Sequence, residues 1–186
     1  DNINWTLPEI KNVFKEEIDQ DLISQLHKKY LNKMVGYLKE LSPQKLSMFN
    51  YSEFKIAVQG KNFIFPFHTD TPKKILSNVI YIGPESNSGT VLSSSKKHED
   101  LKEIEWKRNR ALIFSRNNDQ TWHAFKSDGK NTRITIIFNL MSDDVKKIRI
   151  IEDGFIKYFF KRIFIKNYEA DVERKYLTDN PKDKLI

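Results

Sequence analysis

The chain has 186 residues, of which 39% are hydrophobic and 12% aromatic, so it can bury a sizeable core and does not have the composition of a disordered polypeptide. Cysteine is absent, which excludes disulfides, thiolate metal sites and cysteine nucleophiles, so any metal must be bound through nitrogen and oxygen. The formal net charge is +7, but the basic residues are spread along the chain, which argues against nucleic acid as the partner.

The sequence contains no apolar run long enough to span a membrane, and it does not open with a signal-peptide pattern. We therefore expect a cytoplasmic protein without a transmembrane segment. The first residue is Asp1 rather than Met, which is compatible with the removal of an upstream targeting segment.

Residues 1–50 have helical periodicity and are expected to support the rest of the domain. Thr6-Leu-Pro-Glu9 has the pattern of a capping box that opens a short helix. A longer helix is predicted over about 21–41, and Ser42-Pro43 should end it. Apolar residues recur in this helix at three- and four-residue steps: Leu22, Leu26, Tyr30, Met34, Leu38 and Leu41.

Residues 51–141 change to the two-residue period of β-strands. Turn residues separate eight candidate strands and no helix-length pattern interrupts them, which predicts antiparallel pairing. The fold class is therefore mostly β with flanking α, a double-stranded β-helix of the jelly-roll or cupin type. The strands are predicted at 54–58, 63–68, 75–82, 90–93, 103–106, 111–115, 121–125 and 132–140.

A C-terminal helical extension is predicted over 142–186, with helix from 143 to 178, a break at Gly154 and a frayed tail from Thr178. Its apolar and aromatic residues alternate with basic ones, which favours packing on the barrel or a homodimer formed through these helices. Such a segment can also lie on an anionic membrane. All three regions are expected to form one domain over 1–186. The interspersed basic residues are Lys157, Lys161, Arg162 and Lys166.

His68 and Asp70 are candidate metal ligands, because residues two apart on a strand point to the same face. The spacing alone is weak evidence, since polar pairs on a strand are often only solvated. A third ligand would complete the two-His, one-carboxylate arrangement of non-haem Fe(II) centres, and His123 fits. The second and seventh strands of a jelly roll are neighbours, so 55 positions of sequence between His68 and His123 can close to one site.

The last predicted strand has a polar and an apolar face. Arg133, Thr135 and Ile137 share one face, and Ile134, Ile136, Phe138 and Leu140 share the other. If the Arg133 face lines the barrel, the apolar face needs cover from the 21–41 helix. On the third strand, Tyr81, Val79 and Ser77 should point inward.

The constellation of His68-x-Asp70, His123 and Arg133-x-Thr135 resembles the Fe(II)- and 2-oxoglutarate-dependent dioxygenases. The likeness runs from about Phe63 to Leu140 and is closest to the small prolyl-4-hydroxylase-like branch, which has similar segments between the first and last ligands. The matching segments in this chain are Tyr81-Ile82-Gly83 and Gly89-Thr90-Val91-Leu92.

The resemblance implies an oxygenase that hydroxylates an organic substrate with Fe(II), 2-oxoglutarate and O2, and releases succinate and carbon dioxide. His68, Asp70 and His123 would bind the metal. Arg133 would hold the distal carboxylate of 2-oxoglutarate, because a guanidinium matches a carboxylate, with Thr135 and Tyr81 as further cosubstrate contacts. Asp70 favours hydroxylation over halogenation, because related halogenases have a small residue there.

Two other functions remain open: a cupin-like metal enzyme that does not use 2-oxoglutarate, and a non-catalytic basic binding module. The substrate could be a small molecule or a peptidyl residue. Arg116 and Asn118, in the loop before His123, could meet it. Three further residues are expected to have ordinary structural roles: His98 solvated, His27 at the surface or boundary, and Trp122 walling the pocket or filling the core.

Overall fold

The computed structural model describes residues 20–170 and 174–175. Its helices are α2 (Gln20–Leu41), the 3-10 helix η1 (Pro43–Met48), α3 (Val145–Asp153) and α4 (Phe155–Phe164). Its strands are β1 (Tyr51–Gln59), β2 (Ile64–Thr69), β3 (Lys74–Gly83), β4 (Thr90–Ser93), β5 (Lys102–Ile104), β6 (Ala111–Phe114), β7 (Trp122–Lys126), β8 (Arg133–Met141) and β9 (Arg174–Lys175). The first eight strands coincide with the eight predicted ones to within a few residues.

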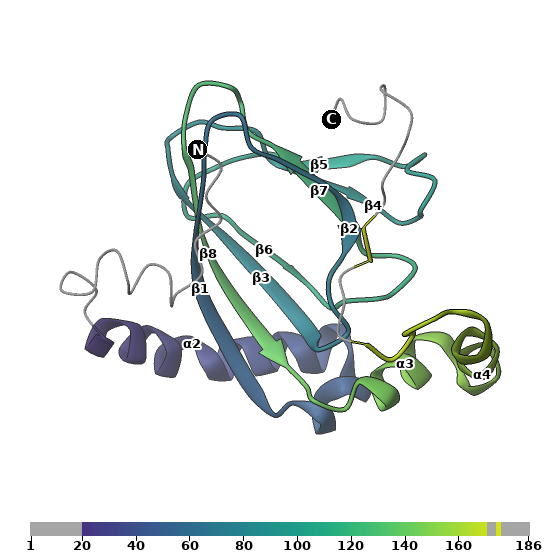
Figure 1. Cartoon of the computed structure of the whole chain (residues 1–186). Coiled ribbons are helices and arrows are strands. Elements are labelled where there is room, and N and C mark those ends of the chain that lie inside the picture. Colours follow the sequence, from purple (N-terminus) through teal and green to yellow (C-terminus); the bar gives the residue numbers. More distant parts are fainter. Residues whose placement is uncertain (1–19, 171–173, 176–186) are drawn as a thin grey trace.

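These strands form two facing antiparallel sheets (Figure 1). One has the order β1-β8-β3-β6 and the other the order β5-β4-β7-β2-β9. A jelly roll has its first, eighth, third and sixth strands in one sheet and its fifth, fourth, seventh and second strands in the other. This chain has the same order, so the predicted fold class is confirmed. The predicted neighbour relation of the second and seventh strands also holds, since β2 pairs with β7.

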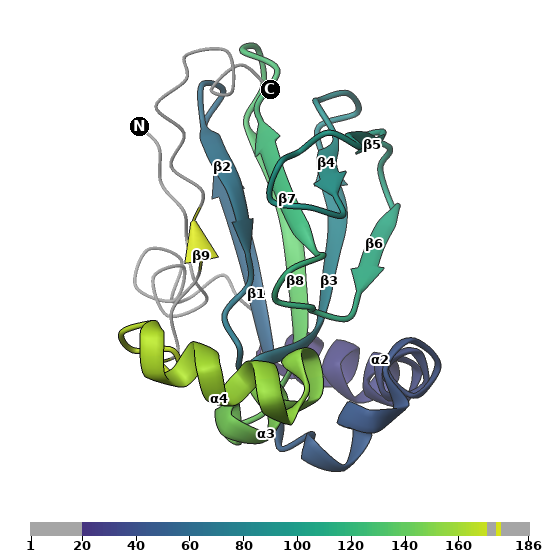
Figure 2. The same cartoon turned by 90° about the vertical axis from the view of Figure 1, so that its right-hand side faces the viewer.

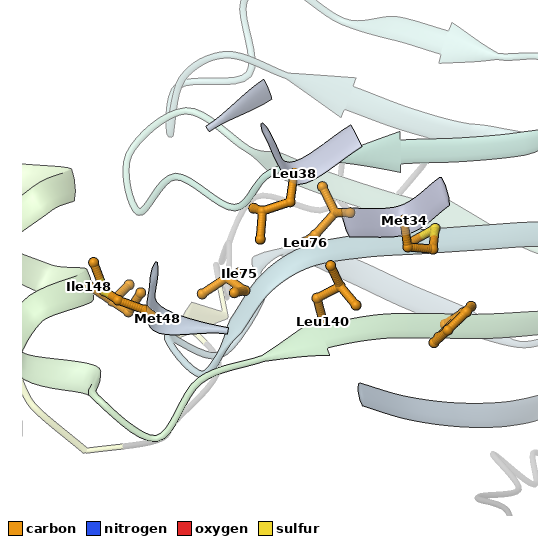
Figure 3. Packing of buried hydrophobic residues seen from close by; sticks show 8 residues of the cluster. Met34, Leu38, Met48, Ile75, Leu76, Leu140 and Ile148 are labelled. Carbon is orange, nitrogen blue, oxygen red and sulfur yellow. The ribbon is translucent and has the colours of Figure 1, made fainter. Parts of the chain in front are cut away.

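The two faces of β8 lie as the alternation predicts. Arg133, Thr135 and Ile137 line a cavity between the sheets. Phe138 and Leu140 point the other way and pack in a buried cluster with residues of α2. Figure 3 shows this cluster, which also contains Met34, Leu38, Met48, Ile75, Leu76 and Ile148.

Helix α2 crosses the outer face of the β1-β8-β3-β6 sheet and covers its apolar side chains (Figure 1). Met34 and Leu38 are buried there, whereas Tyr30 and Leu41 of the same predicted stripe are 42% and 52% exposed. The helix ends before Pro43, as predicted. The predicted capping box at Thr6–Glu9 lies outside the described residues.

The C-terminal helices lie at one end of the barrel (Figure 2). Asp144 caps α3 by accepting a hydrogen bond from the Lys147 amide, and Gly154, with φ of 76°, separates α3 from α4 as the sequence predicts. The prediction of helix as far as residue 178 is wrong. Helix α4 ends at Phe164 because Ile165 is extended, and β9 pairs instead with the free edge of β2.

No helix in the described part of the chain is long and apolar enough to cross a bilayer.

Candidate metal centre

His68, Asp70 and His123 come together where β2 and β7 run side by side. His68 and His123 face each other directly across the strand pair, with ring centroids 4.1 Å apart. Asp70 follows the end of β2. One ligand atom from each of the three side chains lies within 4.8 Å of the other two. The structure thus brings together the three residues that the spacing singles out.

Both imidazoles are held with the same ring nitrogen turned toward the backbone. Nδ1 of His68 lies 3.0 Å from the carbonyl oxygen of Pro66, and Nδ1 of His123 lies 3.1 Å from that of Thr121. A carbonyl oxygen can only accept, so each Nδ1 carries the proton and donates it. This leaves Nε2 of each ring to bind a metal, as in many metal-binding histidines whose other ring nitrogen donates to a backbone carbonyl.

The Asp70 carboxylate is fixed by two donors from the start and middle of β3. Lys74 Nζ lies 2.7 Å from Oδ1, and the Ser77 hydroxyl donates to Oδ2 at 2.6 Å. Burial alone would raise the pKa of Asp70, but the adjacent Lys74 ammonium holds the pKa well below its usual range. Each oxygen keeps a further lone pair, so the ionised carboxylate can still bind a cation.

Burial also keeps His68 neutral. The side chain is 1% exposed, and burial, followed by the proximity of His123, lowers the pKa of His68 to about 3. Two imidazoles and one carboxylate in a partly enclosed site fit Fe(II) or another divalent cation of similar preference.

The three residues line one wall of a cavity of about 170 Å³ between the two sheets. Its other walls are mainly aromatic and aliphatic, and include Phe63, Phe65, Phe114 and Phe125. Arg133 and Thr135 of β8 line the same cavity. A cation site and a guanidinium therefore share one enclosed space.

The Arg133 guanidinium lies in an aromatic enclosure. Its central carbon is 3.8 Å from the ring centroid of Phe125, 5.3 Å from that of Trp106 and 5.4 Å from that of Tyr81. Burial lowers the pKa of Arg133 to about 10, which leaves it charged at neutral pH. Nη2 donates to Thr90 Oγ1 at 3.1 Å, and Nε has no hydrogen-bond partner among the residues that the structure describes.

Arg133 is 2% exposed and makes no ion pair with a carboxylate of residues 20–170. A buried charge without a counter-ion is costly, so the cavity at this point is suited to an anion. The donor set of the chain thus fits both a divalent metal and an organic acid.

The structure places Thr135 and Tyr81 differently with respect to the cavity. Thr135 is buried and lines it beside Arg133. The ring of Tyr81 stacks on Trp106 at 4.5 Å and does not line the cavity, and its hydroxyl donates to Thr90 Oγ1 at 2.7 Å. Tyr81 is therefore connected to Arg133 through the Thr90 hydroxyl, which accepts a hydrogen bond from each of them.

Arg116 and Asn118 do not lie where a substrate could meet them. Each is 1% exposed, and neither lines the cavity. Arg116 forms an ion pair with Glu152 of α3, and its Nε donates to the backbone carbonyl of Asp70 at 2.7 Å. The expectation of substrate contact is wrong: it rests on the position of the loop near the mouth of the barrel, whereas Glu152 supplies Arg116 with a buried partner.

His98 is also placed differently from the prediction. Its ring stacks on Phe67 with centroids 3.8 Å apart and meets the edge of Trp122, so it is a packed residue rather than a solvated one. Trp122 packs in a small core with Phe67 and Ala124 and also lines a second hollow beside His123, so both expected roles apply to it. His27 is partly buried against Phe138, as expected for a boundary residue.

Strand alternation correctly placed Ser77 inside the barrel, but sequence reasoning did not predict its contact with Asp70. It also missed Lys74 beside Asp70, and Thr90 and Phe125 beside Arg133. The position of Phe125 was accessible from strand alternation. The interaction of Thr90 with Arg133 was not, because it joins β4 and β8 from opposite sheets.

No family model matches the sequence, and no curated protein matches it either. Solved structures do match its fold. A Pseudomonas putida prolyl-4-hydroxylase aligns with 62% of this chain and 64% of its own, at 14% identity and a TM-score of 0.47. Prolyl hydroxylases are among its structural neighbours.

Two further neighbours carry the same name. A prolyl 4-hydroxylase from Phytophthora capsici aligns with 68% of this chain and 44% of its own, at 17% identity and a TM-score of 0.49. A Trichoplax adhaerens prolyl hydroxylase, solved with a hypoxia-inducible-factor peptide, aligns with 56% and 49%, at 16% identity and a TM-score of 0.44. The chain spans less than two thirds of the length of each of these three structures.

Proposed function

We propose that this protein is an Fe(II)- and 2-oxoglutarate-dependent dioxygenase that hydroxylates an organic substrate, with consumption of O2 and release of succinate and carbon dioxide. His68, Asp70 and His123 hold the metal. Arg133 holds the distal carboxylate of 2-oxoglutarate, with Thr135 beside it and Tyr81 acting through Thr90.

One observation carries the proposal: a buried guanidinium without a carboxylate partner in the described chain lies in the same cavity as two histidines and an aspartate. Either feature alone has an ordinary structural explanation. Together they match a small keto diacid, whose keto-acid end can bind a metal while its distal carboxylate binds an arginine.

Bound iron supplies the activation of O2 that side chains cannot perform. The chain's own residues contribute binding and orientation. Backbone carbonyls hold the two imidazoles in the metal-binding tautomer, and Lys74 and Ser77 orient the carboxylate of Asp70. The aromatic walls exclude water around Arg133, which strengthens its attraction for an anion.

The substrate is a small molecule or a peptidyl residue that approaches from the His123 side. A second hollow of about 290 Å³ adjoins the metal cavity, and Phe114 and His123 line both. A substrate carbon held there would lie next to the metal while 2-oxoglutarate fills the Arg133 end.

The test is succinate formation from 2-oxoglutarate in the presence of Fe(II) and O2. We expect His68→Ala and Asp70→Ala to abolish it, because each removes a metal ligand. Leu101→Ala, at an exposed position far from these residues in the sequence, is the matched control and should keep full turnover. Undiminished succinate formation by either ligand variant would refute the assignment.

Arg133→Ala separates this proposal from a cupin-like metal enzyme that does not use 2-oxoglutarate. If Arg133 binds the cosubstrate, the variant should need a much higher 2-oxoglutarate concentration while binding the metal as before. An unchanged 2-oxoglutarate requirement would favour the alternative enzyme.

A further inference from the structure

Large apolar side chains gather on the surface of α4. Of the twelve that are exposed in the described part of the chain, seven lie between Phe155 and Ile165. The most exposed are Phe164 at 79%, Ile156 at 73% and Phe155 at 69%, and the others are Phe159, Phe160, Ile163 and Ile165. Scattered apolar residues are normal on a protein surface, but a contiguous group on one helix indicates a contact.

The opposite face of α4 is polar and is turned toward the protein. Lys161 pairs with Asp119 at 3.1 Å and with Asp153 at 2.6 Å, and Lys157 pairs with Asp119 at 2.7 Å. Between them, Tyr158 is 3% exposed and its hydroxyl donates to Glu169. These contacts fix which side of the helix faces outward.

This orientation is the reverse of that of an ordinary surface helix, which buries its apolar stripe and exposes its polar one. The ion pairs would be lost if α4 rolled over to bury its phenylalanines. The apolar face is therefore held outward, where it can meet another apolar phase. Figure 2 shows α4 at the outer end of the molecule beside α3.

The charges around this face identify the kind of surface it fits. From Phe155 to Tyr168 the sequence has four basic residues and no acidic one. Lys157 and Arg162 pair inward but keep side chains 54% and 57% exposed, and Lys166 is exposed as well. Two copies facing each other would oppose these cations, whereas an anionic lipid surface attracts them.

We propose that α4 docks the protein on an anionic membrane surface, with its phenylalanines and isoleucines in the interfacial region and the exposed side chains of Lys157, Arg162 and Lys166 at the lipid headgroups. The inference is independent of the proposed enzymatic function. It assigns a role to the basic aromatic segment that the chemistry at His68, Asp70 and His123 does not use.

The test is co-sedimentation of the full chain with vesicles of phosphatidylcholine alone and of equimolar phosphatidylcholine and phosphatidylserine. We expect binding to the mixed vesicles that weakens with salt, and little binding to phosphatidylcholine alone. The double variant Phe160→Asp/Phe164→Asp should bind the mixed vesicles at least about tenfold more weakly. Leu101→Asp, which changes an equally apolar and 54% exposed residue elsewhere, should bind as the unaltered protein does.

A charge variant keeps the test independent of the double variant. Lys166→Gln, at an exposed position, should weaken binding to the mixed vesicles about fivefold. Equal binding to both kinds of vesicle, or unchanged binding by the double variant, would overturn the proposal. A dimer in light scattering that Phe160→Asp/Phe164→Asp converts to a monomer would assign the face to a second copy instead.

Discussion

Thr90 connects the two residues that define the anion end of the cavity. Its hydroxyl oxygen accepts a hydrogen bond from Tyr81 and another from Arg133, and all three side chains are buried. Thr90 of β4, in the opposite sheet, therefore helps the surrounding aromatic rings to hold the guanidinium in place.

We predict that Thr90→Val lowers the free energy of unfolding by about 1–3 kcal/mol, because two buried donors lose their acceptor while the volume stays nearly the same. It should also weaken 2-oxoglutarate binding. Urea denaturation measures the first effect, and Thr132→Val, at an exposed position one residue before Arg133, is the control and should change stability by less than about 0.5 kcal/mol. A Thr90→Val protein as stable as the unaltered one would show that Thr90 does not hold the two donors.

The sequence was sufficient to propose the three candidate ligands, because strand alternation and the strand order of a jelly roll together determine where their side chains lie. Alternation puts His68 and Asp70 on one side of the chain, and strand order puts His123 next to them. The burial of Arg116 could not be predicted, because its charge is compensated by Glu152, 36 positions later in a helix. His98 was misjudged for a similar reason: the charged residues around it in sequence do not reveal its stacking on Phe67.

Helix α3 is connected to the candidate metal centre by buried ion pairs. The Glu152 side chain is buried and pairs with both Arg116 and Lys45 of η1, and all three side chains are 0–3% exposed. Arg116 in turn donates to the backbone carbonyl of Asp70. The C-terminal extension thus helps to position a proposed ligand.

We predict that Glu152→Gln lowers metal affinity about tenfold or more, since groups behind metal ligands commonly have effects of that size. It should also cost about 3–5 kcal/mol of stability, because it leaves buried cations uncompensated. Titration with Co(II) measures the affinity. The control is Lys147→Gln, which alters an exposed ion pair with Asp144 on the same helix and should leave metal binding unchanged. If Glu152→Gln binds Co(II) as tightly as the unaltered protein, α3 does not help to position the metal ligands.

The attachment of α4 should depend on pH through Asp119. Burial would raise the pKa of Asp119, but hydrogen bonds from Lys157 and Lys161 hold the pKa below its usual range. A lowered pKa in the folded state means that the ion pairs stabilise the fold above the unfolded value, about pH 4, and that this stabilisation is lost as the pH falls.

Asp119→Asn is therefore expected to lower the free energy of unfolding at pH 7 by about 0.5–1 kcal/mol, a modest figure because Asp119 is partly exposed. The difference from the unaltered protein should shrink below about pH 4. Thermal unfolding at a series of pH values checks this, and a difference that does not vary with pH would contradict it.

Most elements were predictable because their periodicity is regular, as in β8, where polar and apolar faces separate cleanly. The end of α4 was not. The segment after Phe164 is still rich in apolar and basic residues, so its composition favours helix, and the pairing of β9 with the edge of β2 depends on a strand more than 100 positions earlier. Contacts of this range are not encoded in local composition.

For the whole molecule, the jelly roll explains how distant residues form one site. The two sheets enclose a cavity with the proposed metal ligands on β2 and β7 and the guanidinium on β8. Helix α2 covers the outer face of one sheet, and α3 and α4 close one end (Figures 1 and 2). The fold thus brings the proposed metal ligands and the guanidinium together, and the hollow beside His123 is where we propose that the substrate binds.

The most direct test of this account is an anaerobic calorimetric titration of 2-oxoglutarate into protein with and without Fe(II). We predict one-to-one binding that requires Fe(II), is lost in His68→Ala and is strongly weakened in Arg133→Ala, although Arg133→Ala still binds the metal. Binding that is indifferent to Fe(II) and to both substitutions would contradict the assignment of this cavity to a metal and a keto diacid.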